Sequence, residues 1–453
     1  MIRSLLSFGV LEAAARGFNW LVLVTLPFFL SSDQYGIVGL IVAAESLGLT
    51  VALIGQDRSV LRFLKDESIT RTELLGSITW ILLASAAVLL VVVVTLQLAG
   101  VVSLAGIPVW PHLWVLLLLV YGLMIVQVNC SLARGTAQPG TFFVNRVVVS
   151  FAKLVLVLGL AYALGSSLSY PVGAAVAVVI IGVASAAGLG TFNLAGSGRV
   201  ARALLRFGWP FVFHAVAGGL LVAADRFLIA AYLDESRVGA YTFAYSVGAS
   251  LSFVYGSLVV YMEPQIYGAS ADGARTRQWT NLFVSACLFG GIGVGLLLVG
   301  VVLPLAAARL GGDYAVATEL VPIIVAAHWI IPLYLVGVYQ LTIEKRTSLI
   351  AASSAAAAVL NIVLNVLWIP TKGLYGAALA TFLSYLCLAV VIGFLSGRTF
   401  FDRARALQWA SLAVVCTVMV LTGASAATYA VGVAVVVLLG VGLYRTYTAH
   451  EWE

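Results

Sequence analysis

Several charged side chains lie inside long runs of apolar residues, where their types and spacing limit the chemistry they can do. Glu12 and Arg16 are four residues apart in the first run, and Asn19 follows on the same face of a helix. This stripe is either a self-neutralising ion pair or the lining of a polar cleft. Glu45 lies in the second run, with no basic residue one helical turn away. Its carboxyl group is either protonated and hydrogen-bonded to a neighbouring helix, or a binding site for a proton or another cation.

Two basic residues share one face of a later apolar run. Arg146 and Lys153 are seven residues apart, which is two helical turns or about 10 Å of rise, and Ser150 lies between them. The Arg146 side chain could extend to the cytoplasmic headgroups, whereas Lys153 lies deeper, where a headgroup contact is less favourable. Two cations rising from the cytosol would suit an anionic, phosphate-bearing substrate.

A further charged pair, Asp225 and Arg226, lies near the end of the seventh apolar run. Adjacent residues of a helix differ in direction by about 100°, so we expect the two side chains to diverge and Arg226 to extend outward. His214, three turns earlier, is either a hydrogen-bonding partner between helices or part of a proton relay.

The composition shows which elements must position these residues. Charged residues make up 9% of the 453 residues and hydrophobic residues 62%, whereas a soluble domain carries about 25% charged residues. So apolar a chain cannot cover itself with a polar surface in water. Continuously apolar stretches such as residues 81–94 exclude an outer-membrane barrel, whose strands alternate polar and apolar residues. The sequence predicts an all-α, polytopic integral membrane protein.

Polar breaks and the spanning length of roughly 20 residues divide the chain into about 14 transmembrane helices. The predicted segments are about 8–30, 36–56, 75–97, 113–132, 143–164, 172–191, 208–232, 239–261, 280–303, 317–340, 348–369, 375–395, 409–427 and 429–445.

The distribution of basic residues predicts the orientation of these segments. When the loops are numbered alternately from the inside, 18 of the 24 Lys and Arg residues fall in inside loops, with Arg146 counted there because it lies at the inner end of its segment. Three fall outside (Arg237, Arg309 and Lys372), and three lie within apolar segments (Arg16, Lys153 and Arg226). Because cytoplasmic loops carry the excess of positive charge, we expect both termini to be cytoplasmic.

A weak internal repeat predicts the domain organisation. Gly36, at the start of the second segment, aligns with Gly239, at the start of the eighth, after similar polar turns. The repeat predicts two parallel six-helix lobes, residues 1–200 and 201–400, around a central cleft. Residues 401–453 would form two extra helices and a cytoplasmic tail. Like-oriented lobes are typical of transporters that work by alternating access.

Short motifs in both halves resemble the polysaccharide transporter (O-antigen repeat-unit flippase) family, whose superfamily also includes multidrug and toxin extrusion pumps. The motifs are Pro27 with Tyr35-Gly36, Gly55 with Arg58, Trp209-Pro210, Ala224-Asp225-Arg226-Phe227-Leu228-Ile229, Val238-Gly239-Ala240-Tyr241, Glu263-Pro264, Leu360-Asn361-Ile362-Val363-Leu364-Asn365, Ile369-Pro370, Gly373, Gly376-Ala377-Ala378 and Thr381.

This resemblance implies a multi-pass protein of the bacterial inner membrane that moves an undecaprenyl-diphosphate-linked oligosaccharide repeat unit for surface polysaccharide synthesis. We expect the protein to be a monomer in the membrane that is coupled to glycan polymerases and glycosyltransferases. Of the candidate site residues, the resemblance supports only Arg58, Asp225 and Arg226. The full prediction for substrate binding is Arg16, Asn19, Arg58, Arg146, Lys153 and Arg226, and for ion coupling Glu12, Glu45 and Asp225.

Other functions find less support in the sequence. Gly196-Ser197-Gly198 is followed by Arg199 rather than by a phosphate-binding Gly-Lys-Ser/Thr, and the four histidines have no metal-ligand spacing. We therefore expect no cofactor, metal, enzymatic activity or nucleic-acid partner. The carboxyl groups of Glu12 and Glu45 suggest an alternative function, that of a proton- or sodium-coupled drug or metabolite antiporter. A glycan polymerase or ligase would need a long external loop, and the longest predicted here is only about residues 98–112.

Overall fold

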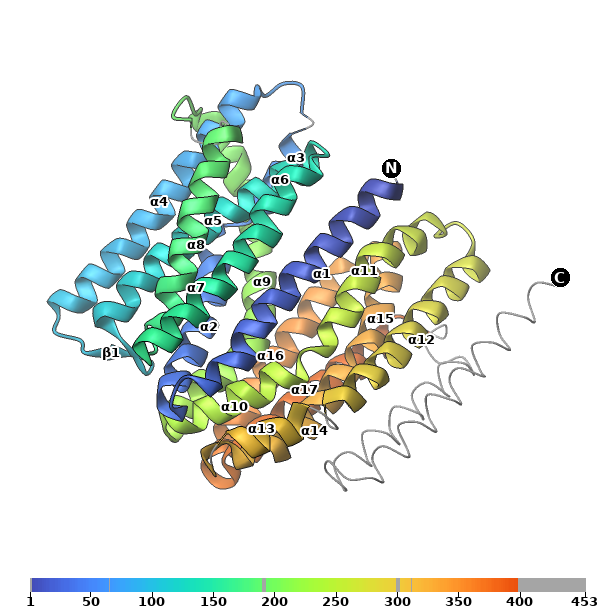
Figure 1. The fold of residues 1–453 in the computed structure, drawn as a ribbon. Helices are drawn as coiled ribbons and strands as arrows, with labels where there is room; N and C mark the ends of the chain where they lie inside the picture. Colours follow the sequence, from blue (N-terminus) through green and yellow to red (C-terminus); the bar gives the residue numbers. More distant parts are fainter. Residues whose placement is uncertain (1, 65, 190–192, 299–301, 311, 398–453) are drawn as a thin grey trace. The chain divides into compact units, whose positions relative to one another are not determined.

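The computed structural model describes most of the chain as helices (Figure 1). The described residues are 2–64, 66–189, 193–298, 302–310 and 312–397. The chain forms two compact units, residues 1–239 and 240–453. The predicted lobe boundary near residue 200 stays a prediction, and the two helices predicted within 401–453 lie outside the described residues.

The described part of the first unit contains nine α-helices, the start of a tenth, and several short elements. In chain order they are α1 (Ile2–Thr25), η1 (Leu26–Phe28), α2 (Ser32–Leu53), α3 (Gln56–Phe63), α4 (Arg71–Leu98), β1 (Ser103–Leu104), β2 (Ile107–Pro108), η2 (Val109–Leu113), α5 (Trp114–Gly135), α6 (Pro139–Phe143), η3 (Val144–Val148), α7 (Val149–Leu164), α8 (Ser169–Leu189), α9 (Gly198–Tyr232) and the first residues of α10 (Glu235–Gly248). Strands β1 and β2 form an antiparallel hairpin, and η2 and η3 are π-helical turns that lead into α5 and α7.

The described part of the second unit is also helical. It contains the rest of α10, then α11 (Leu251–Gly268), α12 (Gly273–Leu297), α13 (Leu303–Arg309), η5 (Gly312–Tyr314), α14 (Ala315–Trp329), α15 (Ile331–Ile343), α16 (Thr347–Lys372) and α17 (Leu374–Leu395).

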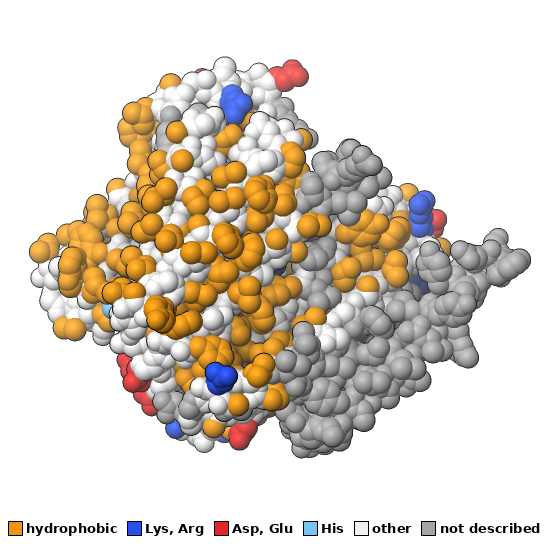
Figure 2. All heavy atoms as spheres, in the orientation of Figure 1, with side chains coloured by type: hydrophobic (Ala, Val, Ile, Leu, Met, Phe, Trp, Pro, Cys, Tyr) orange, Lys and Arg blue, Asp and Glu red, His pale blue; other side chains and the backbone are white. Residues whose placement is uncertain are grey.

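The predicted all-helical membrane fold is confirmed. Within the described residues, ten helical stretches are long and apolar enough to cross a membrane. Large apolar side chains such as Val88 and Val91 on α4 and Ile180 on α8 are exposed, and Figure 2 shows apolar side chains over most of the visible described face. So much exposed apolar surface is stable in lipid rather than in water.

Of the twelve segments predicted before residue 398, two, 239–261 and 280–303, are not among these ten stretches. The first is divided into α10 and α11 after Gly248, which packs closely against α14: a Cβ atom at Gly248 would lie 2.6 Å from Cγ2 of Ile324. The second corresponds to α12, which begins earlier than predicted and carries Arg275 in its first turn. The hydropathy pattern located both regions, but it did not predict the break after Gly248 or the polar first turn of α12.

Polar residues fix where several helices begin. Before α4, the Thr70 hydroxyl accepts a hydrogen bond from the backbone N–H of Glu73, whose carboxylate accepts one from the backbone N–H of Thr70. Before α12, the Asp272 carboxylate accepts hydrogen bonds from the N–H groups of Ala274 and Arg275. These caps satisfy N–H groups that have no partner inside the helix. The helices therefore start before the apolar runs by which they were predicted.

The starts of α2 and α10, which the sequence repeat pairs, pack directly against each other. A Cβ atom at Gly36 would overlap the carbonyl oxygen of Glu235, and one at Gly239 would overlap the carbonyl oxygen of Ser32. The Ser236 hydroxyl donates a hydrogen bond to the Ser32 hydroxyl at 2.9 Å. The two contacts are reciprocal, and they require glycine because only its missing side chain lets the backbones approach so closely.

Candidate functional site: ion pairs on helices α1, α2, α7 and α8

One carboxylate, that of Glu12 on α1, binds two guanidinium groups. Its Oε1 lies 3.1 Å from Nε of Arg16, one turn along the same helix. Arg146, in η3, donates through Nε to Oε2 at 2.9 Å and through Nη2 to Oε1 at 3.1 Å. Two cations thus share one anion, which leaves an excess of one positive charge. The side chains of Arg16 and Arg146 are 47% and 34% exposed, so the positive charge of the cluster is not buried.

A neutral contact continues the polar stripe between α1 and α7, which pack against each other. The amide nitrogen of Asn19 donates to the Ser150 hydroxyl at 2.9 Å and to the carbonyl oxygen of Ala15 at 2.9 Å. The rings of Phe18 and Phe151 meet edge to face beside this contact. Asn19 is thereby placed beside α7, on the face that carries the basic residues.

The deeper cation, Lys153 on α7, belongs to a buried cluster of three side chains. Its ammonium lies 3.6 Å from Oε1 of Glu45 on α2 and donates to the hydroxyl oxygen of Tyr170 on α8 at 2.9 Å. The Tyr170 hydroxyl in turn donates to Oε2 of Glu45 at 2.8 Å. The Lys153 and Glu45 side chains are only 8% and 14% exposed. This Lys153–Tyr170–Glu45 triad is electrically balanced, unlike the Glu12 cluster.

The structure corrects the prediction for the pair on α9. Asp225 and Arg226 do not diverge, because Nη1 of Arg226 lies 3.1 Å from Oδ1 of Asp225. Arg226 also does not extend outward: it is buried, and the same nitrogen donates to the carbonyl oxygen of Val222 at 2.7 Å. The helical angle describes only where a side chain leaves the backbone. The long arginine side chain folds back along its own helix.

Arg58 lies on α3 and contacts α9, the helix that also carries Arg226. Its guanidinium stacks 4.7 Å from the centre of the Phe211 ring on α9, and its side chain is exposed. The structure thus brings together Glu12, Arg16 and Arg146 in one cluster and Glu45 with Lys153 in another, and it pairs Asp225 with Arg226 on α9. The side chain of His214 lies outside the described residues.

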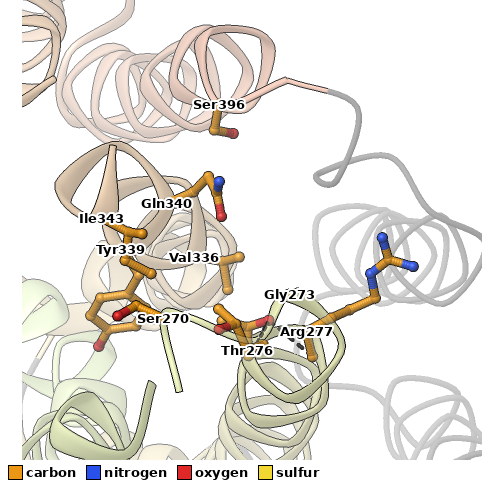
Figure 3. A pocket seen from close by; sticks show the side chains of 10 residues that line it. Ser270, Gly273, Thr276, Arg277, Val336, Tyr339, Gln340, Ile343 and Ser396 are labelled. Atoms are coloured by element: carbon orange, nitrogen blue, oxygen red, sulfur yellow. Dashed lines mark hydrogen bonds between the residues drawn. The ribbon is translucent and has the colours of Figure 1, made fainter. Parts of the chain in front are cut away.

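A cavity of about 130 Å³ lies in the second unit, at the first turns of α12 (Figure 3). It is lined by Ser270, Gly273, Thr276, Arg277, Thr280, Val336, Tyr339, Gln340, Ile343 and Ser396. None of the site residues predicted from the sequence is among them. The described residues also contain no group of three or more His, Cys, Asp and Glu side chains that could hold a metal ion.

A family model described as polysaccharide biosynthesis protein matches residues 2–262, more than half of the chain. The chain belongs to this family. The match covers both ion clusters and α9, so all nine candidate residues lie within the family region. A comparison with curated protein sequences found no significant match.

Three solved structures that share this fold are membrane transporters. The lipid II flippase MurJ, in an inward closed conformation, aligns with a TM-score of 0.71 at 14% identity, over 97% of this chain and 100% of that chain. The multidrug transporter DinF-BH, of the MATE type, gives 0.60 at 15% identity, over 88% and 97%. An outward-facing MATE transporter of the MOP superfamily gives 0.52 at 13% identity, over 91% and 96%. The chain therefore belongs to the polysaccharide biosynthesis protein family and shares its fold with these membrane transporters.

Tyr170 is the site residue that the sequence alone did not suggest. Aromatic residues near segment ends are typical anchors at the membrane interface, and Tyr170 stands beside Pro171 at the start of an apolar helix. The available signal was its hydroxyl group, since a buried tyrosine needs a polar partner. The sequence could not show which partner that would be.

Proposed function

We propose that the chain is a flippase that moves an undecaprenyl-diphosphate-linked oligosaccharide repeat unit across the bacterial inner membrane for surface polysaccharide synthesis. The family match and the transporter fold support this proposal. The observation that carries it is the excess positive charge of the Glu12–Arg16–Arg146 cluster on α1 and η3. An anionic headgroup needs such a charge in order to leave water.

In the proposed mechanism, Arg16 and Arg146 hold the diphosphate while the lipid tail stays in the bilayer and the glycan passes along the polar stripe. Guanidinium groups present paired donors that match phosphate oxygens. The negative charge of Glu12 offsets the repulsion between the two guanidinium groups and so keeps them close together. Asn19 offers a neutral amide for a sugar hydroxyl. The protein then alternates between inward- and outward-open states.

We expect Arg16→Ala and Arg146→Ala each to lower the flipping rate at least about tenfold, because each removes a charge-assisted hydrogen bond to the diphosphate. The measurement uses purified protein in vesicles that contain the lipid-linked oligosaccharide. Arg346→Ala is the matched control, since Arg346 forms an exposed pair with Glu344 in the second unit and should flip normally. Normal flipping by both cluster variants would show that these arginines do not hold the substrate.

A second candidate function is a proton- or sodium-coupled multidrug or metabolite antiporter. It is favoured by the buried carboxylate of Glu45, next to a lysine and a tyrosine, and by the shared fold with MATE transporters. Drug efflux that depends on an ion gradient, together with failure to move a lipid-linked oligosaccharide, would select this function over the flippase.

The proposal includes an orientation and a setting in the cell. Both termini would be cytoplasmic, and the protein would act as a monomer. Glycosyltransferases would supply its substrate, and glycan polymerases would consume the substrate after transport. The orientation rests on the excess of Lys and Arg in the predicted inside loops. Labelling of single cysteines placed at Arg237 and at Arg275 with an impermeant reagent in intact cells tests it: only the first should react.

A further inference from the structure

We infer that Tyr170 is a positioning residue for transport: its hydroxyl holds Lys153 and Glu45 together and lets Lys153 exchange Glu45 for a phosphate oxygen of the substrate. This inference rests on the proposed function and assigns a role within it to the buried triad.

The distances show that the Tyr170 hydroxyl links the other two side chains of the triad. The direct separation between Nζ of Lys153 and Oε1 of Glu45 is 3.6 Å, longer than a normal hydrogen bond. The two contacts through Tyr170 are 2.9 Å and 2.8 Å. The hydroxyl accepts from the ammonium and donates its single proton to the carboxylate, so both of its roles are in use. Lys153 and Glu45 are therefore connected mainly through Tyr170.

The position of Lys153 relates this triad to the proposed substrate path. Lys153 follows Arg146 by two helical turns, about 10 Å, and Ser150, which contacts Asn19, lies between them. The ammonium sits at the end of a flexible four-carbon chain, which can swing without moving α7. It is the next cation that a diphosphate would meet after leaving the Glu12 cluster.

Tyr170 makes this exchange possible because it keeps Glu45 hydrogen-bonded when Lys153 moves away. A buried carboxylate that loses its only partner is strongly unfavourable. With phenylalanine at position 170, Lys153 would be the one remaining partner of Glu45 within the triad, and the two charges would close into a direct ion pair. Lys153 would then be held in place and unable to bind the substrate.

The test compares flipping by four full-length proteins in vesicles containing the lipid-linked oligosaccharide: wild type, Tyr170→Phe, Lys153→Met and the double variant. We expect each single variant to flip about tenfold more slowly. The double variant should be no slower than Lys153→Met, because Tyr170 acts through Lys153. Tyr162→Phe is the matched control: this tyrosine, also in the first unit, is largely exposed on α7, and its variant should flip like wild type.

Thermal unfolding of the same proteins separates positioning from folding. We expect Tyr170→Phe to unfold within a few degrees of wild type. Normal flipping by Tyr170→Phe, a double variant as slow as the product of the two single effects, or a loss of flipping by Tyr170→Phe that follows a loss of its stability would each overturn the inference. If wild type moves no lipid-linked oligosaccharide, the proposed function falls as well, whereas in the other outcomes it stands.

Discussion

Glu45→Ala should destabilise the protein by about 3–5 kcal/mol, because it leaves the ammonium of Lys153 buried without a counter-ion. Tyr170 offers that ammonium only a neutral oxygen. The loss would appear as a fall in the thermal unfolding midpoint of about 3–5 °C, measured on purified protein in detergent.

A second substitution tests the physical reason for this effect. Glu45→Ala combined with Lys153→Met should recover most of the lost stability, since a flexible apolar side chain replaces the unpaired charge. Glu344→Ala is the control, because it breaks the exposed ion pair with Arg346 and should cost less than about 1 kcal/mol. If the double variant is as unstable as Glu45→Ala, unpaired charge is not the cause.

Gly36→Ala should also be strongly destabilising, because its new methyl group would overlap the carbonyl oxygen of Glu235. The backbones of α2 and α10 would have to separate, and the hydrogen bond between Ser32 and Ser236 would break with them. Overpacking of this kind costs about 1–3 kcal/mol, and more when the obstructing atom belongs to the backbone. Thermal unfolding of the purified variant measures it.

The matched control for this prediction is Gly159→Ala on α7, where a Cβ atom would have nothing within 4 Å. Alanine there should be neutral or raise the stability by up to about 1 kcal/mol, because glycine is the poorer helix former. Equal stability of Gly36→Ala and Gly159→Ala would show that the close approach of α2 and α10 contributes nothing to the fold.

Sequence reasoning was most successful where a local rule governs the outcome. The i, i+4 spacing of Glu12 and Arg16 suggested an ion pair as one of two interpretations. The structure contains this ion pair, with Nε of Arg16 3.1 Å from Oε1 of Glu12. The spacing did not reveal that Arg146, 134 residues away, binds the same carboxylate. The prediction that Asp225 and Arg226 diverge was wrong, because the angle of about 100° between adjacent residues does not take into account how far a long side chain can reach.

By itself, the sequence determined that this protein is a bundle of membrane-spanning helices. In lipid every backbone polar group needs a partner inside the protein, which only helices and closed barrels provide, and continuously apolar segments of spanning length exclude the barrel. Only the tertiary structure decided which charges neutralise each other. Ion pairing depends on distances of about 3 to 4 Å between helices, and neither hydropathy nor spacing along the chain encodes those distances. The difference between the positively charged Glu12 cluster and the balanced Lys153–Tyr170–Glu45 triad therefore became visible only once α1, α2, α7 and α8 were packed together.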